Sequence, residues 1–182
     1  MVGFTEDETL KFLKDYGLED CFSKVKEHYA GYKFFDKEIF NPVDVVNFVK
    51  DNFEHKKHGS EIKTGTYWCD LVSDRELTEH IAYLIDHASQ VIQDLVDGKS
   101  ICFEINKSIC FEINKSMDYD CLPMISLNDF WSLLLHKGYL TIDWDATRAL
   151  DERTRRIKVY AKLPNFEIKE FFEKMLKKWV RD

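Results

Sequence analysis

The sequence predicts a mainly helical α+β protein in two parts, and three observations support this fold class. Apolar residues recur at the three- and four-residue spacing of amphipathic helices over most of the 182 residues. Short runs in the second half of the chain alternate between apolar and polar side chains, as strands do. Three prolines and seven glycines are too few for long irregular stretches. We therefore expect a helical subdomain over residues 1–54, a linker over 55–72 and a second unit over 73–182.

The first part should contain three helices. Residues 5–8 have the S/T-x-x-E pattern of a capping box, so a helix should begin there and end at Gly17. A second helix should follow, with its apolar face formed by Cys21, Phe22, Val25 and Tyr29. Residues 31–35 should form a non-helical aromatic corner. Asn41 and Pro42 then supply the cap and first position of a third helix.

The second part should alternate helices with short strands. A long helix with one apolar stripe is expected over residues 73–97, and Gly98 should end it. Next we expect a strand over residues 101–105, a short helix or turn over 117–124, and a strongly apolar helix over 126–137 that is capped by Ser126 or Asn128. A strand over 139–144, a polar loop over 145–155 and a second strand over 157–163 should follow. An amphipathic helix opened by Pro164 and Asn165 should end the chain. The order of these elements is that of a winged-helix-like unit with a small antiparallel sheet and a C-terminal helix.

An octapeptide occurs twice in tandem within this unit. Residues 100–107 read SICFEINK, and residues 108–115 repeat them without change. The repeat arose by a short coding duplication or was introduced deliberately. Because eight is an even number, a strand shifted by one repeat keeps every side chain on its original face, so either copy fits one strand position. We favour a tolerated insertion, since loops absorb extra length at small entropic cost. A hairpin in which the two copies pair is the alternative.

Charge and composition narrow the function classes. The net charge is −7, which disfavours non-specific contact with nucleic acid or anionic lipid. Residues 145–182 nevertheless carry 11 basic and 7 acidic side chains, so any polyanion contact would lie there. No apolar run approaches the roughly 20 residues of a membrane span, and the acidic N-terminus is no signal peptide. Five widely spaced cysteines and scattered histidines indicate reduced thiols in a cytoplasmic protein, with no metal site and no cofactor.

Several stretches, found in one order along nearly the whole chain, together resemble a known family. They are residues 3–8, 25–34, 39–48, 67–68, 130–141 and 163–167. The chain resembles the C-terminal part of the bacterial AAA-ATPase-like domain that is often fused to a PD-(D/E)xK nuclease-like domain. The resemblance implies that residues 1–54 are a small helical lid-like subdomain and that the winged-helix-like unit is its extension.

The chain departs from that family where the catalytic parts would be. No G-x-x-x-x-G-K-[ST] motif is present, so the backbone cradle and the lysine that hold phosphates are missing. The nuclease-like half is absent too. Two E-x-K matches, at residues 61–63 and 167–169, are short enough to arise by chance, and Glu167 is expected to cap its helix. We therefore predict that the protein is not an enzyme.

Two groups of residues are candidate contact sites. The only basic cluster lies in the loop and strand near the C-terminus, and its members are Arg148, Arg153, Arg155, Arg156 and Lys158. It could follow phosphates, although acidic residues interleave with it. The second group is the lid corner, formed by Tyr32, Lys33 and Phe34. Lys33 would contact a phosphate in a complete ATPase, but we favour an aromatic corner that packs two helices together.

These observations lead to one function and two alternatives. We expect a non-catalytic protein-interaction module that docks on a protein partner and does not bind a membrane. The first alternative is a winged helix that binds nucleic acid through the basic residues at 148–158. The helix at 126–137 argues against it, because its polar face offers no arginine for base edges. The second alternative is an acidic inhibitor or antitoxin-like protein that occludes a basic partner.

Overall fold

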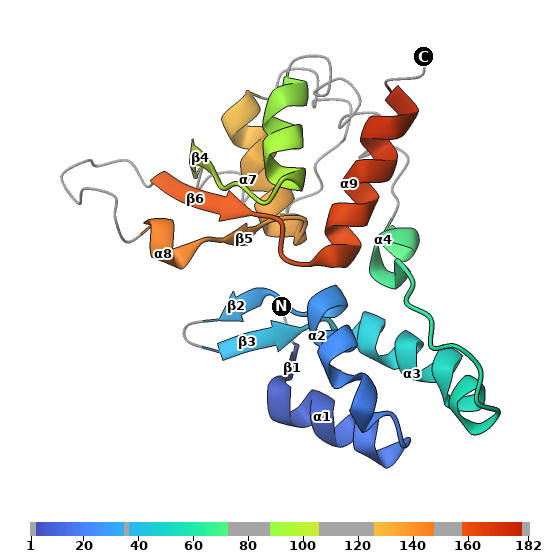
Figure 1. The fold of residues 1–182 in the computed structure, drawn as a ribbon. Helices are drawn as coiled ribbons and strands as arrows, with labels where there is room; N and C mark the ends of the chain where they lie inside the picture. The colour runs from blue at the N-terminus through green and yellow to red at the C-terminus, as the bar shows by residue number, and fades with distance from the viewer. Residues whose placement is uncertain (1–2, 35–36, 73–87, 106–125, 148–157, 180–182) are drawn as a thin grey trace. The chain divides into compact units, whose positions relative to one another are not determined.

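The computed structural model describes residues 3–34, 37–72, 88–105, 126–147 and 158–179, and Figure 1 shows them as ribbon. The fold is mixed α+β and mainly helical, with two small antiparallel sheets of three strands each. The chain divides into two compact units. The first comprises residues 1–73 and 164–171, and the second comprises residues 74–163 and 172–182. None of the described helices is long and apolar enough to cross a membrane.

The first unit combines four helices of the N-terminal part with a short sheet. The helices are α1 (Glu6–Asp15), α2 (Phe22–Tyr29), α3 (Pro42–Lys57) and α4 (Tyr67–Val72). A 3-10 turn at Glu19–Cys21 joins α1 to α2. The strands are β1 (Phe4–Thr5), β2 (Tyr32–Phe34) and β3 (Lys37–Phe40), with β3 in the centre. The core of this unit is formed by Leu13, Leu18, Cys21, Val25, Tyr29, Ala30, Phe40, Val45, Phe48 and Val49.

Helix starts in the first unit follow the sequence pattern closely. The Thr5 hydroxyl accepts the Glu8 N–H at 3.3 Å, and the Glu8 carboxylate accepts the Thr5 N–H at 2.8 Å, so the expected capping box is present. Asn41 caps α3 through its side-chain oxygen, which accepts the Val43 N–H at 3.0 Å, and Pro42 is the first helical residue. The expected linker at 55–72 needs correction, because α3 continues to Lys57 and α4 occupies its last six residues.

The second unit is built on a three-stranded sheet with β6 in the centre. The strands are β4 (Ile101–Glu104), β5 (Thr141–Ile142) and β6 (Lys158–Lys162), and both outer strands run antiparallel to β6 (Figure 1). Residues 88–96 are helical and bury Ala88, Ile92 and Leu95, as the apolar stripe predicted. α7 (Leu127–Lys137) contacts β4, buries Trp131 and Leu134, and is capped by Ser126.

The strand expected at residues 139–144 is confirmed only in its middle, because residues 139–140 and 143–144 are not in a strand. β5 ends at Ile142, and α8 (Trp144–Thr147) begins two residues later. The reason is Asp143, whose side-chain oxygen accepts the Ala146 N–H at 3.3 Å and so turns the chain into a helix. The expected turn at 117–124, the second octapeptide at 108–115 and most of the loop at 145–155 lie outside the described residues.

The last helix, α9 (Phe166–Trp179), contributes to both units. Residues up to Phe171 belong to the first unit and residues from Phe172 belong to the second. Asn165 caps this helix by accepting the Ile168 N–H at 3.1 Å, and its side-chain NH₂ donates to the Ala30 carbonyl at 2.9 Å. The first unit thus includes a C-terminal segment that the sequence-based boundaries had assigned entirely to the second part.

Candidate functional site

Two carboxyl groups of the first unit are almost completely buried, and they meet at α4. Asp44 lies in the first turn of α3, and Glu167 lies in the first turn of α9. The Trp68 N–H donates to both carboxyl groups, at 2.8 Å to Asp44 Oδ1 and 2.9 Å to Glu167 Oε1, and the Cys69 N–H donates to Glu167 Oε1 at 3.1 Å. The two side chains therefore satisfy N–H groups that α4 leaves unpaired in its first turn.

The environment of this carboxyl pair favours one retained proton. Burial raises the pKa of Asp44 to about 9, and the nearby charge of Glu167 adds to the increase, while the Trp68 N–H opposes it. Two carboxyl groups this close cannot both stay ionised at low cost, so the pair is best described as sharing one proton near neutral pH. Because both side chains are buried, the pair holds α3, α4 and α9 together and is closed to a dissolved substrate.

Two further buried side chains attach the segment before α4 to the same unit. Asn52 donates from its side-chain NH₂ to the carbonyls of Phe48 and Lys63, both at 2.8 Å, and accepts the Lys63 N–H at 2.8 Å. The Tyr29 hydroxyl donates to the Gly65 carbonyl at 3.2 Å and accepts the Gly65 N–H at 3.1 Å. The chain between α3 and α4 is thus fixed in place by hydrogen bonds although it has no regular structure.

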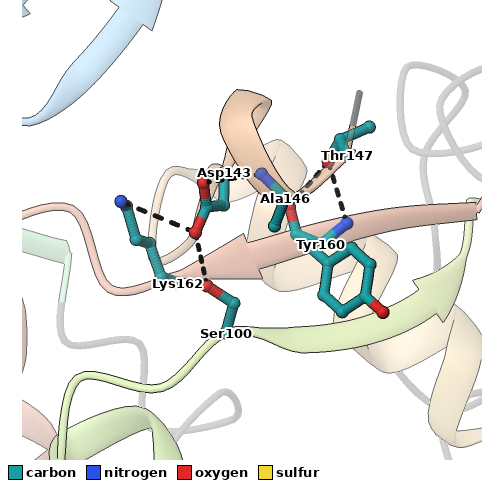
Figure 2. Close-up of polar contacts among 6 residues, drawn as sticks. All are labelled: Ser100, Asp143, Ala146, Thr147, Tyr160 and Lys162. Carbon is teal, nitrogen blue, oxygen red and sulfur yellow. Dashed lines mark hydrogen bonds and ion pairs between the residues drawn. The ribbon is translucent and has the colours of Figure 1, made fainter. Parts of the chain in front are cut away.

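The second unit has a polar cluster at the end of its sheet, centred on Asp143 (Figure 2). Ser100, just before β4, donates its hydroxyl to Asp143 Oδ2 at 2.6 Å, and Lys162 Nζ at the end of β6 lies 3.7 Å from the same oxygen. The Asp143 N–H donates to the Tyr160 carbonyl at 2.8 Å. One carboxylate therefore connects β4, β5, β6 and α8.

The cluster fixes the short helix α8 to the sheet. The Thr147 N–H donates to the Asp143 carbonyl at 2.8 Å, and the Tyr160 N–H on β6 donates to the Thr147 hydroxyl at 3.0 Å. The hydrogen bond from Ser100 holds the pKa of Asp143 below its usual value, with smaller contributions from the Ala146 N–H and the charge of Lys162. A carboxylate with a lowered pKa is a weak base, so it is poorly suited to activate the Ser100 hydroxyl as a nucleophile.

α8 presents a large apolar side chain on this fixed backbone. Trp144, its first residue, is 36% exposed. Tryptophan offers a large contact area and has only two side-chain torsions to immobilise, and for this reason it is over-represented among the residues that dominate protein interfaces. From the sequence, Trp144 was expected at the end of a strand and was not among the predicted contact residues.

The residues predicted to form contact sites fall in two groups. Lys158 is exposed at the start of β6, where its Cα partner is Glu104, while Arg148, Arg153, Arg155 and Arg156 lie outside the described residues. Tyr32, Lys33 and Phe34 form β2, an outer strand of the first sheet. Tyr32 is buried, and Lys33 is exposed and faces Glu38 in the strand register. The non-helical corner is therefore one side of a β-hairpin with β3.

Sequence reasoning missed the pairing of Asp44 with Glu167 and the role of Asp143. Glu167 was expected to cap its own helix, but Asn165 does that, and Glu167 accepts from α4 instead. A local signal exists only for Asp143, because aspartate favours a turn or a helix start. Nothing local indicates that Glu167 meets Asp44.

Comparison with protein families, with curated proteins and with solved structures found no match.

Proposed function

We propose that this chain is a non-catalytic protein-interaction module, similar to the lid and winged-helix part of an AAA-ATPase-like protein. The element order of the second unit and its sheet with β6 between β4 and β5 support the winged-helix part of the proposal. The polar clusters described above support a non-catalytic role, because each of them holds chain segments together.

The observation that carries the proposal is the exposed Trp144 on a backbone that is already fixed. Three hydrogen bonds that join Asp143 and Thr147 to Tyr160 hold α8 against β6, and two more, from the Ala146 and Thr147 N–H groups to Asp143, fix the turn itself. A partner that covers Trp144 would gain its apolar contact area without first having to order the backbone, and ordering is one of the main costs of association. We assign Trp144 as the central side chain of the interface with a protein partner.

The test is partner capture with two matched variants. The full chain is immobilised as wild type, as Trp144→Ser and as Leu127→Ser, and each is exposed to an extract of the native host. Leu127 is the control because it is also the first residue of a helix in the second unit and is 44% exposed. We expect a partner that wild type and Leu127→Ser retain and that Trp144→Ser loses, with melting curves showing that all three are folded.

Two results would count against this function. If every captured protein were retained equally by Trp144→Ser, the interface would not use α8. If the chain instead bound duplex DNA with an affinity that falls steeply as salt rises, the nucleic-acid alternative would be favoured.

A further inference from the structure

The position occupied by β4 has a second potential occupant in the same chain. Residues 101–104 of the first octapeptide are paired to β6 in the sheet, with Phe103 opposite Val159. Phe103 is buried, while Cys102, its neighbour, is exposed, so the strand has one inward face. Residues 109–112 have the same sequence, and they follow eight positions later.

Every contact that β4 makes through its own side chains could be reproduced by the second copy. A shift by eight residues would bring Phe111 opposite Val159 and keep it on the inward face, because side chains alternate with a period of two. It would also bring Ser108 to the position from which Ser100 donates to Asp143. The sheet thus has no side-chain contact by which it could distinguish the two copies.

The connections on either side permit the shift. The connection to Ser126 would shorten from the 20 residues 106–125 to the 12 residues 114–125, which can span about 40 Å. β4 and α7 are about 13 Å and 16 Å long and touch each other, so 12 residues suffice. The connection from the helix at 88–96 would lengthen by eight residues. Loop closure becomes about threefold less probable for each doubling of length. Shortening the second connection therefore makes closure about twofold more probable, lengthening the first from four to twelve residues makes it about fivefold less probable, and the shift costs a factor of only about two to three.

We propose that the two octapeptides exchange in the β4 position, so that the second unit populates two strand registers eight residues apart. The exchange is a conformational property of the fold and is independent of the proposed function. Its consequence is that either copy alone can complete the sheet, while the other copy is left outside it.

The test compares Phe103→Ala, Phe111→Ala and the double variant in the full chain. Phe130→Ala is the control, because Phe130 is buried to the same 3% exposure as Phe103 in the same unit and occurs once. The readout is the folding equilibrium constant of the second unit from urea titrations. We expect each single variant to lower it less than tenfold, and the double variant to lower it by about a hundredfold or more, as Phe130→Ala does.

Each other pattern would overturn the proposal. If Phe103→Ala alone were as harmful as Phe130→Ala and Phe111→Ala were silent, β4 would have a single register. If both single variants were that harmful, the two copies would be needed together, as in a paired hairpin. A mild double variant would mean that neither copy supplies a buried phenylalanine to the sheet, and the exchange would be ruled out with it.

Discussion

Replacing Gly31 with alanine is expected to be among the most damaging single-methyl changes in the chain. The φ angle of Gly31 is +96°, and a Cβ built on its backbone would lie 1.7 Å from the Pro164 carbonyl oxygen. A side chain there must both adopt a disfavoured φ angle and displace the backbone at the start of the C-terminal segment. The hydrogen bond from Asn165 to the Ala30 carbonyl, one residue away, would be displaced with it. We expect a loss of about 3–6 kcal/mol in the free energy of unfolding of the first unit.

Gly17→Ala separates the two causes of this loss. Gly17 also has a positive φ angle, +68°, but a Cβ there would meet nothing within 4 Å. It should therefore cost only the conformational strain, about 1 kcal/mol. Urea titration followed through amide signals of the first unit measures both variants. Equal losses for Gly17→Ala and Gly31→Ala would show that residues 164–165 do not pack against Gly31.

The second large effect concerns the carboxyl pair and pH. The raised pKa of Asp44, about 9, means that the folded protein holds a proton that the unfolded chain releases near pH 4. The stabilisation linked to this proton is complete below pH 4, declines as pH rises and is lost above pH 9. Wild type should thus lose up to about 1.4 kcal/mol of unfolding free energy per pH unit within this window, relative to a variant without the titrating group.

Asp44→Asn is the variant that removes this titration. Its amide keeps an oxygen that can accept the Trp68 N–H, and it carries no charge beside Glu167, so its stability should exceed that of wild type at pH 9. The control is Glu27→Gln, which removes an exposed carboxyl group on α2 and should follow the wild-type pH dependence. The unfolding free energy is measured at pH 6, 7.5 and 9 for all three proteins. Parallel curves for wild type and Asp44→Asn would mean that the pair holds no extra proton.

The local features of the fold could be predicted because their causes are local. The capping box at Thr5, the cap at Asn41, a cap at Ser126 or Asn128 and a strand over 101–105 were predicted from residues within four positions of one another, and the structure has Ser126 as the cap and the strand at 101–104. The first sheet was missed for a related reason. Its strands have two to four residues, so no alternation is long enough to be recognised, and β1 and β2 are held by pairing to β3 across the unit.

The candidate site and the unit boundary could not be predicted because they depend on contacts between distant residues. Glu167 accepts from Trp68, 99 positions earlier, and Asn165 donates to Ala30 across 135 positions. Neither contact leaves a pattern in its own neighbourhood. The assignment of residues 164–171 to the first unit, which follows from these contacts, is therefore a result of the structure alone.

The most direct test of the proposed function is the affinity of the purified chain for the partner that the capture experiment identifies. The dissociation constant is measured by titration calorimetry for wild type, Trp144→Ser and Leu127→Ser under one buffer condition. A central tryptophan contributes at least about 2 kcal/mol to an interface, so Trp144→Ser should weaken binding roughly thirtyfold or more, while Leu127→Ser should bind as wild type does. Equal dissociation constants for wild type and Trp144→Ser would contradict the proposal that α8 presents the interface.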